Sequence, residues 1–254
     1  MNSNHRSGQV ALITGGARGI GLETARGLGR LGIGVVLTGR DPNRGATAAN
    51  SLRAEGIDAE YFGGDLTDPK HRQACVSYFE RHHHGKLDIL VNNAAVWLDS
   101  ESASHTTPNR TSSLSAEVLR ATFEANFFAP VLLTQLLLPL ILKAPAGRIV
   151  NVSAELGSLS LHADPSSIVY GLKPFAYASS KTALNAFTVH LAHELRDTPV
   201  KVNSVHPGWV RTAMGGSKAP LDVVEGSRTS VHFATLPWNG PTGGYFRADE
   251  AIPW

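Results

Sequence analysis

Short apolar runs alternate with longer amphipathic stretches along most of the chain. The runs predict strands at Val10–Thr14, Val35–Thr38, Ala59–Phe62, Ile89–Val91, Arg148–Val152 and Val200–Val205. The stretches between them predict helices at Gly21–Leu31, Asn43–Glu55, Pro69–His83, Ala116–Leu142 and Phe175–Leu195. Strands that alternate with helices indicate parallel strands joined by right-handed crossovers. We therefore expect an α/β fold with a doubly wound parallel sheet between two helical layers.

The pattern continues from end to end without a Pro/Gly/Ser-rich linker or an internal repeat. We therefore expect a single domain over residues 1–254, with a front half of about 150 residues and a second half over 151–254. Three stretches lack a clear period and are predicted to be irregular: Ser100–Ser113, Leu156–Pro174 and Gly215–Thr242. The last two flank the residues that we single out below as chemical.

The amino-acid composition is that of a globular protein and limits its expected partners and location. Hydrophobic residues make up 42% and charged residues 17%, which is enough to build a core. The net charge is only +2 and no run of like charges occurs, so nucleic acid is not an expected partner. A lone cysteine excludes a disulfide framework. The first residues, Met1–Gln9, have no apolar segment, and the apolar run Val131–Leu142 is too short to span a bilayer. We expect a cytoplasmic protein.

Glycines are concentrated where the first strand meets the first helix, in the sequence TGGARGIG at Thr14–Gly21. Glycines at that junction let the backbone approach a pyrophosphate at the helix N-terminus. An ordinary loop is the alternative, since such turns also occur without a ligand. The position between strand and helix favours a Rossmann-type dinucleotide site, with candidate residues Gly15, Ala17, Arg18, Gly19, Ile20 and Gly21.

Arg40 follows the second strand, 40 − 21 = 19 residues beyond the last of these glycines. NAD sites place an acidic residue there to bind the ribose 2′-hydroxyl. An arginine instead pairs with a 2′-phosphate, which indicates NADP(H). Arg18 and Arg44 are candidates for the same positive pocket, and exposed surface arginines are the alternative. The adjacent Asp41 leaves an NAD-like arrangement open.

Tyr177 and Lys181 are four residues apart within a predicted helix, so their side chains share a face. Free tyrosine has a pKa of ~10, and a nearby ammonium lowers it by favouring the phenolate. Such a tyrosine can protonate a carbonyl oxygen while hydride reaches the carbon. The YxxxK spacing by itself is common, so a catalytic role for Tyr177 depends on the other motifs in the chain.

The ordered set of motifs resembles the short-chain dehydrogenase/reductase family over nearly the whole chain, and within it the NADPH carbonyl reductases. The motifs are Thr14–Gly21, Asp65–Leu66, Asn92–Ala95, Asn126, Ser153, Tyr177 with Lys181, and Pro207–Gly208. The resemblance implies that Tyr177 is the general acid and that Ser153 binds the substrate oxygen. It also implies that Lys181 lowers the pKa of Tyr177 and holds the nicotinamide ribose, while Asn126 holds a water that links Lys181 to solvent.

The same resemblance implies cofactor contacts with the adenine at Asp65, with the adenosine ribose at Asn92, and with the nicotinamide along the segment after Pro207. The full set that it adds is Asp65, Leu66, Asn92, Ala94, Pro207, Gly208, Val210 and Thr212. Individual alternatives remain. Asp65 is also a possible N-cap for the helix from Pro69, Ser153 a strand cap, and Asn126 an ordinary helix residue.

Trp97, Trp209 and Met214 lie close in sequence to these motifs and are candidates for an apolar substrate pocket, with core or lid packing as the alternative. No metal is expected, because consecutive histidines such as His82–His84 do not share a helix face.

We thus expect NADPH-dependent reduction of a ketone or aldehyde. A non-catalytic NADP(H)-binding regulator on the same fold is the alternative, and a dedicated steroid, sugar or acyl-thioester enzyme is a third. The spacing from Ser153 to Tyr177 is 177 − 153 = 24 residues, longer than in common relatives. Since the extra residues fall where such insertions cover a helical dimer surface, monomer and homo-oligomer both remain open.

Overall fold

The computed structural model describes residues 8–99 and 111–254. The first half contains β1 (Val10–Thr14), α1 (Gly19–Arg30), β2 (Gly34–Gly39), α2 (Pro42–Ala54), β3 (Ala59–Gly63), α3 (Pro69–His82) and β4 (Ile89–Asn92). After the short turn η1 (Thr111–Ser113) come α4 (Ala116–Phe123), η2 (Glu124–Phe128), α5 (Ala129–Ile141), β5 (Arg148–Val152), η3 (Glu155–Gly157) and α6 (Leu159–Ala163). The last part contains α7 (Phe175–Glu194), β6 (Lys201–Val205), α8 (Val223–Ala234), β7 (Tyr245–Arg247) and β8 (Glu250–Ala251).

The strands form one sheet in the order β3-β2-β1-β4-β5-β6-β7-β8. All neighbours are parallel except β7 and β8, which are antiparallel. Strand order reverses between β1 and β4, since β2 and β3 lie on one side of β1 and the later strands lie on the other. In doubly wound sheets ligands bind at such a switch point, outside the carboxyl ends of the strands.

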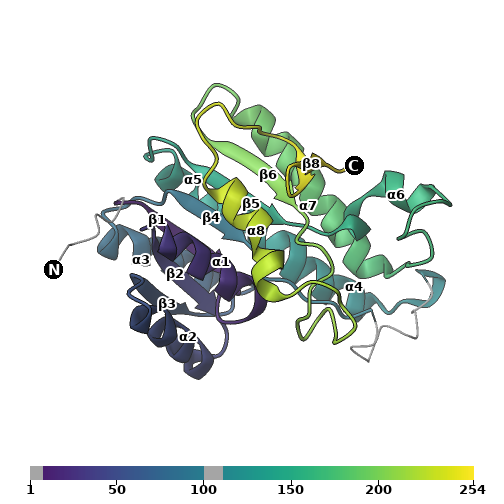
Figure 1. Cartoon of the computed structure of the whole chain (residues 1–254), viewed down its shortest axis with the longest axis horizontal. Helices are drawn as coiled ribbons and strands as arrows, with labels where there is room; N and C mark the ends of the chain where they lie inside the picture. The colour runs from purple at the N-terminus through teal and green to yellow at the C-terminus, as the bar shows by residue number, and fades with distance from the viewer. Residues whose placement is uncertain (1–7, 100–110) are drawn as a thin grey trace.

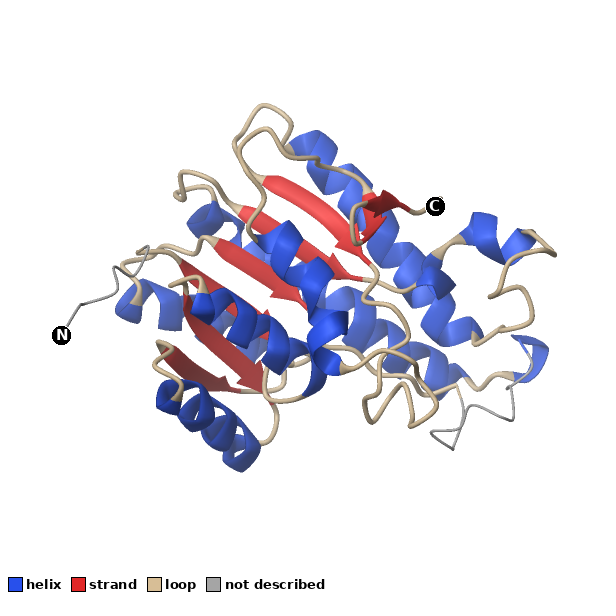
Figure 2. Ribbon diagram, in the orientation of Figure 1, coloured by secondary structure: helices blue, strands red, loops and turns tan. Residues whose placement is uncertain are grey.

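Helices cover both faces of the sheet, as Figures 1 and 2 show, with α1 and α8 in front of the strands. Alternate residues of β1 point to opposite faces. Ala11 and Ile13 pack with α1, α2 and α8. Val10 and Leu12 pack in a second core with α3, α5 and α7. The predicted three-layer α/β fold is confirmed.

The predicted helix Ala116–Leu142 is present as α4, the π-helical turn η2 and α5 in direct succession. By length and composition the stretch Ala116–Ile141 is apolar enough to cross a membrane. In the fold, however, Leu133, Leu137 and Ile141 pack in the core against the sheet. The π-helical turn places Asn126 inside the protein, where the next subsection takes it up.

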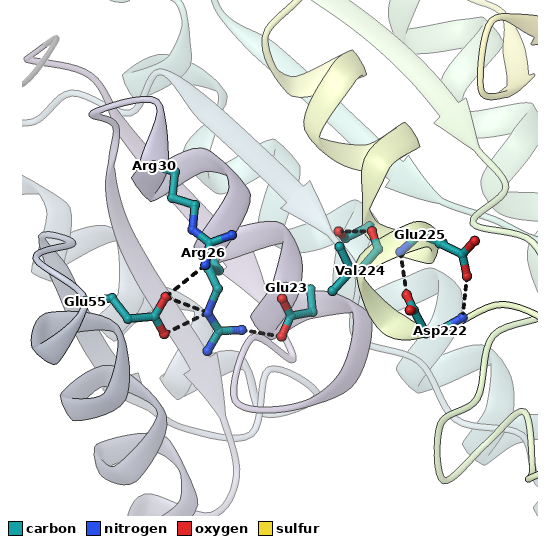
Figure 3. A network of polar contacts seen from close by, with 8 residues as sticks. Glu23, Arg26, Arg30, Glu55, Asp222, Val224 and Glu225 are labelled. Carbon is teal, nitrogen blue, oxygen red and sulfur yellow. Dashed lines mark hydrogen bonds and ion pairs between the residues drawn. The ribbon is translucent and has the colours of Figure 1, made fainter.

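The segment Gly215–Thr242, predicted to be irregular, contains helix α8. Asp222 accepts a hydrogen bond from the Glu225 amide at 2.8 Å, and the Glu225 side chain accepts one from the Asp222 amide at 2.9 Å (Figure 3). This capping box starts α8, and weak helix formers such as Gly226 hid its period. The prediction for this segment was therefore wrong. Helix α8 packs beside α1, on which Arg26 pairs with Glu23 and Glu55 (Figure 3).

The segment Leu156–Pro174, also predicted to be irregular, contains most of η3 and the short helix α6, followed by turns over 164–173. Strands β7 and β8, near the end of the chain, were not predicted either. Of the predicted loop Ser100–Ser113, residues 100–110 lie outside the described residues, and 111–113 form η1.

Candidate active site

A cleft of about 1180 Å³ runs along the carboxyl ends of the strands. It collects the predicted site residues from segments far apart in sequence. Its lining includes Gly15, Ala17, Arg18, Gly19, Ile20, Gly21, Arg40, Arg44, Asp65, Leu66, Ala94, Trp97, Ser153, Tyr177, Lys181, Pro207, Gly208, Trp209, Val210, Thr212 and Met214. Among the predicted residues, Asn92 and Asn126 do not line this cleft.

The glycine turn has the backbone that its sequence requires. Gly15 and Gly19 have φ values of +63° and +55°, a region that side chains disfavour. A Cβ at Gly21 would lie 2.5 Å from the Asn93 amide nitrogen. Helix α1 begins at Gly19 without a side-chain cap, so its first N–H groups face the cleft unused by the protein's own side chains. Such a helix start suits a phosphate group.

The end of β2 is fixed by neighbouring groups. Tyr61 on β3 donates to the backbone oxygens of Gly39 and Asp41, at 2.6 and 3.0 Å. Its ring packs so close to Gly45 that a Cβ there would lie 2.1 Å away. The Asp41 carboxylate caps α2 at the Arg44 amide and lies 3.6 Å from the Arg44 guanidinium. Asp41 therefore serves as the N-cap of α2.

Asp65 lies at the cleft and does not cap the helix from Pro69, whose N-cap is Asp68. Its carboxylate accepts from the amide and hydroxyl of Thr67 at 3.0 and 2.8 Å. Burial acts to raise the pKa of Asp65, but the Thr67 bonds and the charge of Arg40 together lower it. The carboxylate therefore stays ionised beside the arginine pocket.

The side chain of Asn92 faces away from the cleft, contrary to the expected cofactor contact. It is buried and donates to Thr134 at 3.0 Å and to Asn151 at 2.8 Å. The following residue, Asn93, lines the cleft instead and donates to the Thr14 carbonyl at 2.8 Å. Successive residues at a strand end point to opposite faces, which explains why the neighbour takes the position.

Tyr177 and Lys181 lie on adjacent turns of α7, with the Lys181 Nζ 5.7 Å from the centre of the Tyr177 ring. The same Nζ donates to the Val152 carbonyl at 2.8 Å. Ser153, directly after β5, has a buried hydroxyl that no protein group satisfies. The predicted serine, tyrosine and lysine therefore line the same cleft.

Burial controls the acidity of this pair. It raises the pKa of Tyr177 above the ordinary value of 10 and lowers that of Lys181 to about 8. The net pKa of Tyr177 therefore lies above its ordinary value, because loss of solvation disfavours the charged form of both groups. The expected effect of Lys181 on Tyr177 stays a prediction. Lys181 remains mostly protonated at neutral pH.

Asn126 lies in the π-helical turn, and both ends of its amide bind protein groups. Its oxygen accepts from the Val96 amide at 2.8 Å. Its nitrogen donates to the Val96 carbonyl at 2.9 Å and to the Ser180 hydroxyl at 3.1 Å. The side chain therefore braces the segment after β4 against α7, and the expected water link from Asn126 to Lys181 stays a prediction.

Aromatic and aliphatic side chains also line the cleft. The Trp97 ring stacks on Tyr177 at a centroid distance of 4.5 Å. The Trp209 indole donates to the Gly215 carbonyl at 2.8 Å and is 55% exposed. Further lining residues come from the inserted segment and were not predicted: Ile168, Val169, Leu172 and Pro174. Their apolar character in an otherwise irregular stretch was the available signal.

Sequence analysis also missed a polar cluster formed by His206, Glu155 and Arg247. His206, which lines the cleft, lies 3.5 Å from Glu155, and Glu155 pairs with Arg247 at 3.2 Å. Burial, with the charge of Arg247, lowers the pKa of His206 to about 3, so the imidazole is neutral. Tyr245 on β7 also has a buried hydroxyl without a hydrogen-bond partner, and burial raises its pKa.

Comparison with known proteins identifies the family of the chain. The family model described as short chain dehydrogenase matches residues 9–221. Carbonyl reductase [NADPH] 1 of Sus scrofa is 32% identical, over 100% of this chain and 96% of its own. Salutaridine reductase of Papaver bracteatum is 30% identical, over 95% of each. The NADPH-bound carbonyl reductase from chicken fatty liver superposes with a TM-score of 0.82 at 26% identity, covering 97% and 99%.

The fold and the site define an oxidoreductase with a Rossmann-type sheet. The chain belongs to the short-chain dehydrogenase family.

Proposed function

We propose that the protein reduces a ketone or aldehyde to an alcohol with NADPH, and that Tyr177 donates the proton. The observation that carries this proposal is that Tyr177, Lys181 and the unsatisfied Ser153 hydroxyl line the same cleft as Arg18, Arg40 and Arg44. The NADPH carbonyl reductases among its relatives support the same reaction class.

The cofactor fits the residues present. The uncapped start of α1 suits its pyrophosphate, and the orphaned Ser153 hydroxyl marks the reacting end of the cleft. Arg18, Arg40 and Arg44 would bind the 2′-phosphate, with Asp65 near the adenine and Val210 and Thr212 near the nicotinamide. When bound, NADPH supplies the hydride. The front half of the chain, to about residue 150, thus holds most of the cofactor, and the second half carries the reacting groups.

The chain's own residues supply the proton and the polar contacts. Tyr177 transfers its phenolic proton to the carbonyl oxygen as the carbon is reduced. Ser153 donates a hydrogen bond to that oxygen and stabilises its developing negative charge. The Lys181 ammonium, with a pKa of about 8, stabilises the phenolate that remains. Burial of all three keeps water away and strengthens these interactions.

The substrate is a small molecule with apolar bulk next to its carbonyl group. Trp97 and the inserted residues Ile168 and Leu172 offer apolar contact, and 82% of Ile168 is exposed. Such walls bind rings and alkyl groups by removing their surface from water. The single cysteine, Cys75, is buried, and burial raises the pKa of its thiol.

The test is NADPH oxidation with a panel of ketones, aldehydes and quinones, each followed by identification of the alcohol product. Carbonyl-dependent oxidation of NADPH supports the proposal. Tight NADPH binding with no turnover on any carbonyl compound would identify the non-catalytic binding protein instead.

A further inference from the structure

Helix α7 begins without an N-terminal cap from its own sequence. Pro174, at the cap position, makes no side-chain hydrogen bond, and the first turn is Phe175, Ala176 and Tyr177. The first N–H groups of a helix have no intrahelical partner. The Ala178 amide donates to the Pro174 carbonyl at 2.8 Å, which leaves the earlier amides to be satisfied from elsewhere.

Asp99 supplies the missing partner from 77 residues away. Its carboxylate accepts from the Ala176 amide at 2.7 Å and from the Tyr177 amide at 2.9 Å, one bond on each oxygen. The side chain is only 3% exposed. A buried carboxylate is costly unless it is hydrogen-bonded, and the positive end of a helix favours it further. The carboxylate therefore holds the backbone of Tyr177 firmly.

The segment that carries Asp99 is itself fixed. The Asn126 amide holds both the N–H and the carbonyl of Val96, at 2.8 and 2.9 Å. Trp97 stacks on the Tyr177 ring with an interplanar angle of 16°. The segment Val96–Asp99 thus contacts Tyr177 at two places, the ring and the backbone amide, and is anchored to the π-helical turn behind it.

From this geometry we propose that Asp99 is a positioning residue for Tyr177, an inference that rests on the role of Tyr177 under the proposed function. Lys181 is one turn further along and has a separate anchor in its bond to Val152 at 2.8 Å. Loss of the Asp99 carboxylate therefore loosens the first turn and displaces Tyr177, while Lys181 keeps its place. Asp99 therefore sets the distance between the Tyr177 hydroxyl and the Lys181 ammonium.

The test compares Asp99→Ala and Asp99→Asn with Asp68→Ala, which removes the cap of α3 outside the cleft. We expect kcat of Asp99→Ala to fall by about 10²-fold, the loss that follows a ~1 Å misplacement of a reacting group. The NADPH Kd and the substrate KM should stay unchanged. Asp99→Asn, which keeps one acceptor oxygen, should show a smaller fall. Asp68→Ala should lose stability but keep kcat.

Hydrogen–deuterium exchange gives a readout that needs neither cofactor nor turnover. In Asp99→Ala the amides of residues 175–177 should exchange faster, while those near Glu194 at the end of α7 keep their wild-type rates. Wild-type kcat together with wild-type exchange in Asp99→Ala would overturn the proposal. If that variant does not fold, wild-type kcat and exchange in Asp99→Asn overturn it.

Failure of the proposed function has a different signature. If none of the carbonyl compounds tested makes the wild-type protein oxidise NADPH, the proposed reaction is wrong. The exchange experiment still decides whether Asp99 holds the first turn of α7. Conversely, an active wild type whose Asp99 variants match it in kcat, KM and exchange retains the proposed function and loses only the role of Asp99.

Discussion

The Lys181 ammonium donates a hydrogen bond to the Val152 carbonyl at 2.8 Å. Val152 ends β5 and Ser153 follows it, so this bond joins the strand that presents the serine to the helix that presents Tyr177. The three groups form one buried unit. Because residues that act as a unit have non-additive effects, a double variant of Ser153 and Tyr177 should lose little more turnover than the worse single one.

Replacing Tyr177 by Phe should abolish most of the turnover while leaving cofactor binding intact. A positioned general acid contributes roughly 10²–10⁴-fold, and we expect kcat to fall by that factor. The NADPH Kd, measured by fluorescence titration, should stay at the wild-type value because the ring and its stacking on Trp97 remain. Tyr170→Phe, at an exposed tyrosine of the inserted segment, is the matched control. Near wild-type kcat in Tyr177→Phe contradicts the assigned role.

Arg40→Asp should shift the preference from NADPH toward NADH. A charge-assisted hydrogen bond contributes about 1.5–3 kcal/mol, and ~1.4 kcal/mol corresponds to tenfold, so the ratio of kcat/KM values should fall by at least about tenfold. Steady-state kinetics with both cofactors measure it. Arg81→Asp, an equal charge change on α3 away from the cleft, should leave the ratio unchanged. An unchanged ratio in Arg40→Asp would show that the 2′-phosphate is recognised elsewhere.

His206 should make the protein sensitive to acid. The pKa of His206 is about 3 in the fold, against 6.5 for an ordinary imidazole, so between these pH values the unfolded chain binds a proton that the folded chain does not. Stability therefore falls as the pH drops through this window. For this group alone the loss from pH ~7 to ~5 is about 2 kcal/mol.

His206→Gln should accordingly lose less stability over that range than the wild type. Urea denaturation at both pH values measures the difference, with His190→Gln at an exposed position as the control. Equal acid losses in His206→Gln and wild type would mean that the imidazole is solvated or already charged in the folded protein.

The capping box of α8 should contribute measurably to stability. Asp222→Ala removes the acceptor of the Glu225 amide at 2.8 Å, and loss of such a cap costs about 1 kcal/mol. Thermal or urea unfolding measures it. Asp197→Ala, at a position whose side chain is 84% exposed, should change the free energy of unfolding by less than about 0.5 kcal/mol. A Tm for Asp222→Ala equal to that of the control refutes the contribution.

Most of the fold follows from periodicity, because parallel strands buried on both faces and amphipathic helices leave distinct patterns. Helix α8 escaped because it contains Gly226 and several serines and threonines, whose propensity is poor. Its signal was present in the Asp222-x-x-Glu225 pattern. Strand β7 has only three residues, too few to show a period.

The site was predictable where residues follow strands, since the carboxyl ends of parallel strands meet at one edge. The choice between Asn92 and Asn93 was not, because it depends on where the pleat of β4 stops. Asp99 left no local trace, as its partners lie 77 and 78 residues away. The direction of the Tyr177 pKa required knowledge of burial, which a YxxxK spacing does not contain.

Tyr61 fixes the backbone of Gly39 and Asp41, so the backbone conformation here does not depend on the side chain that recognises the cofactor. The main chain on both sides of Arg40 is fixed from β3, with Gly45 leaving room for the ring. Side chains at position 40 can therefore be exchanged without rebuilding the loop. Substitution at the end of β2 is therefore a way to change which reduced cofactor an engineered enzyme consumes, while Ser153, Tyr177 and Lys181 remain unaltered.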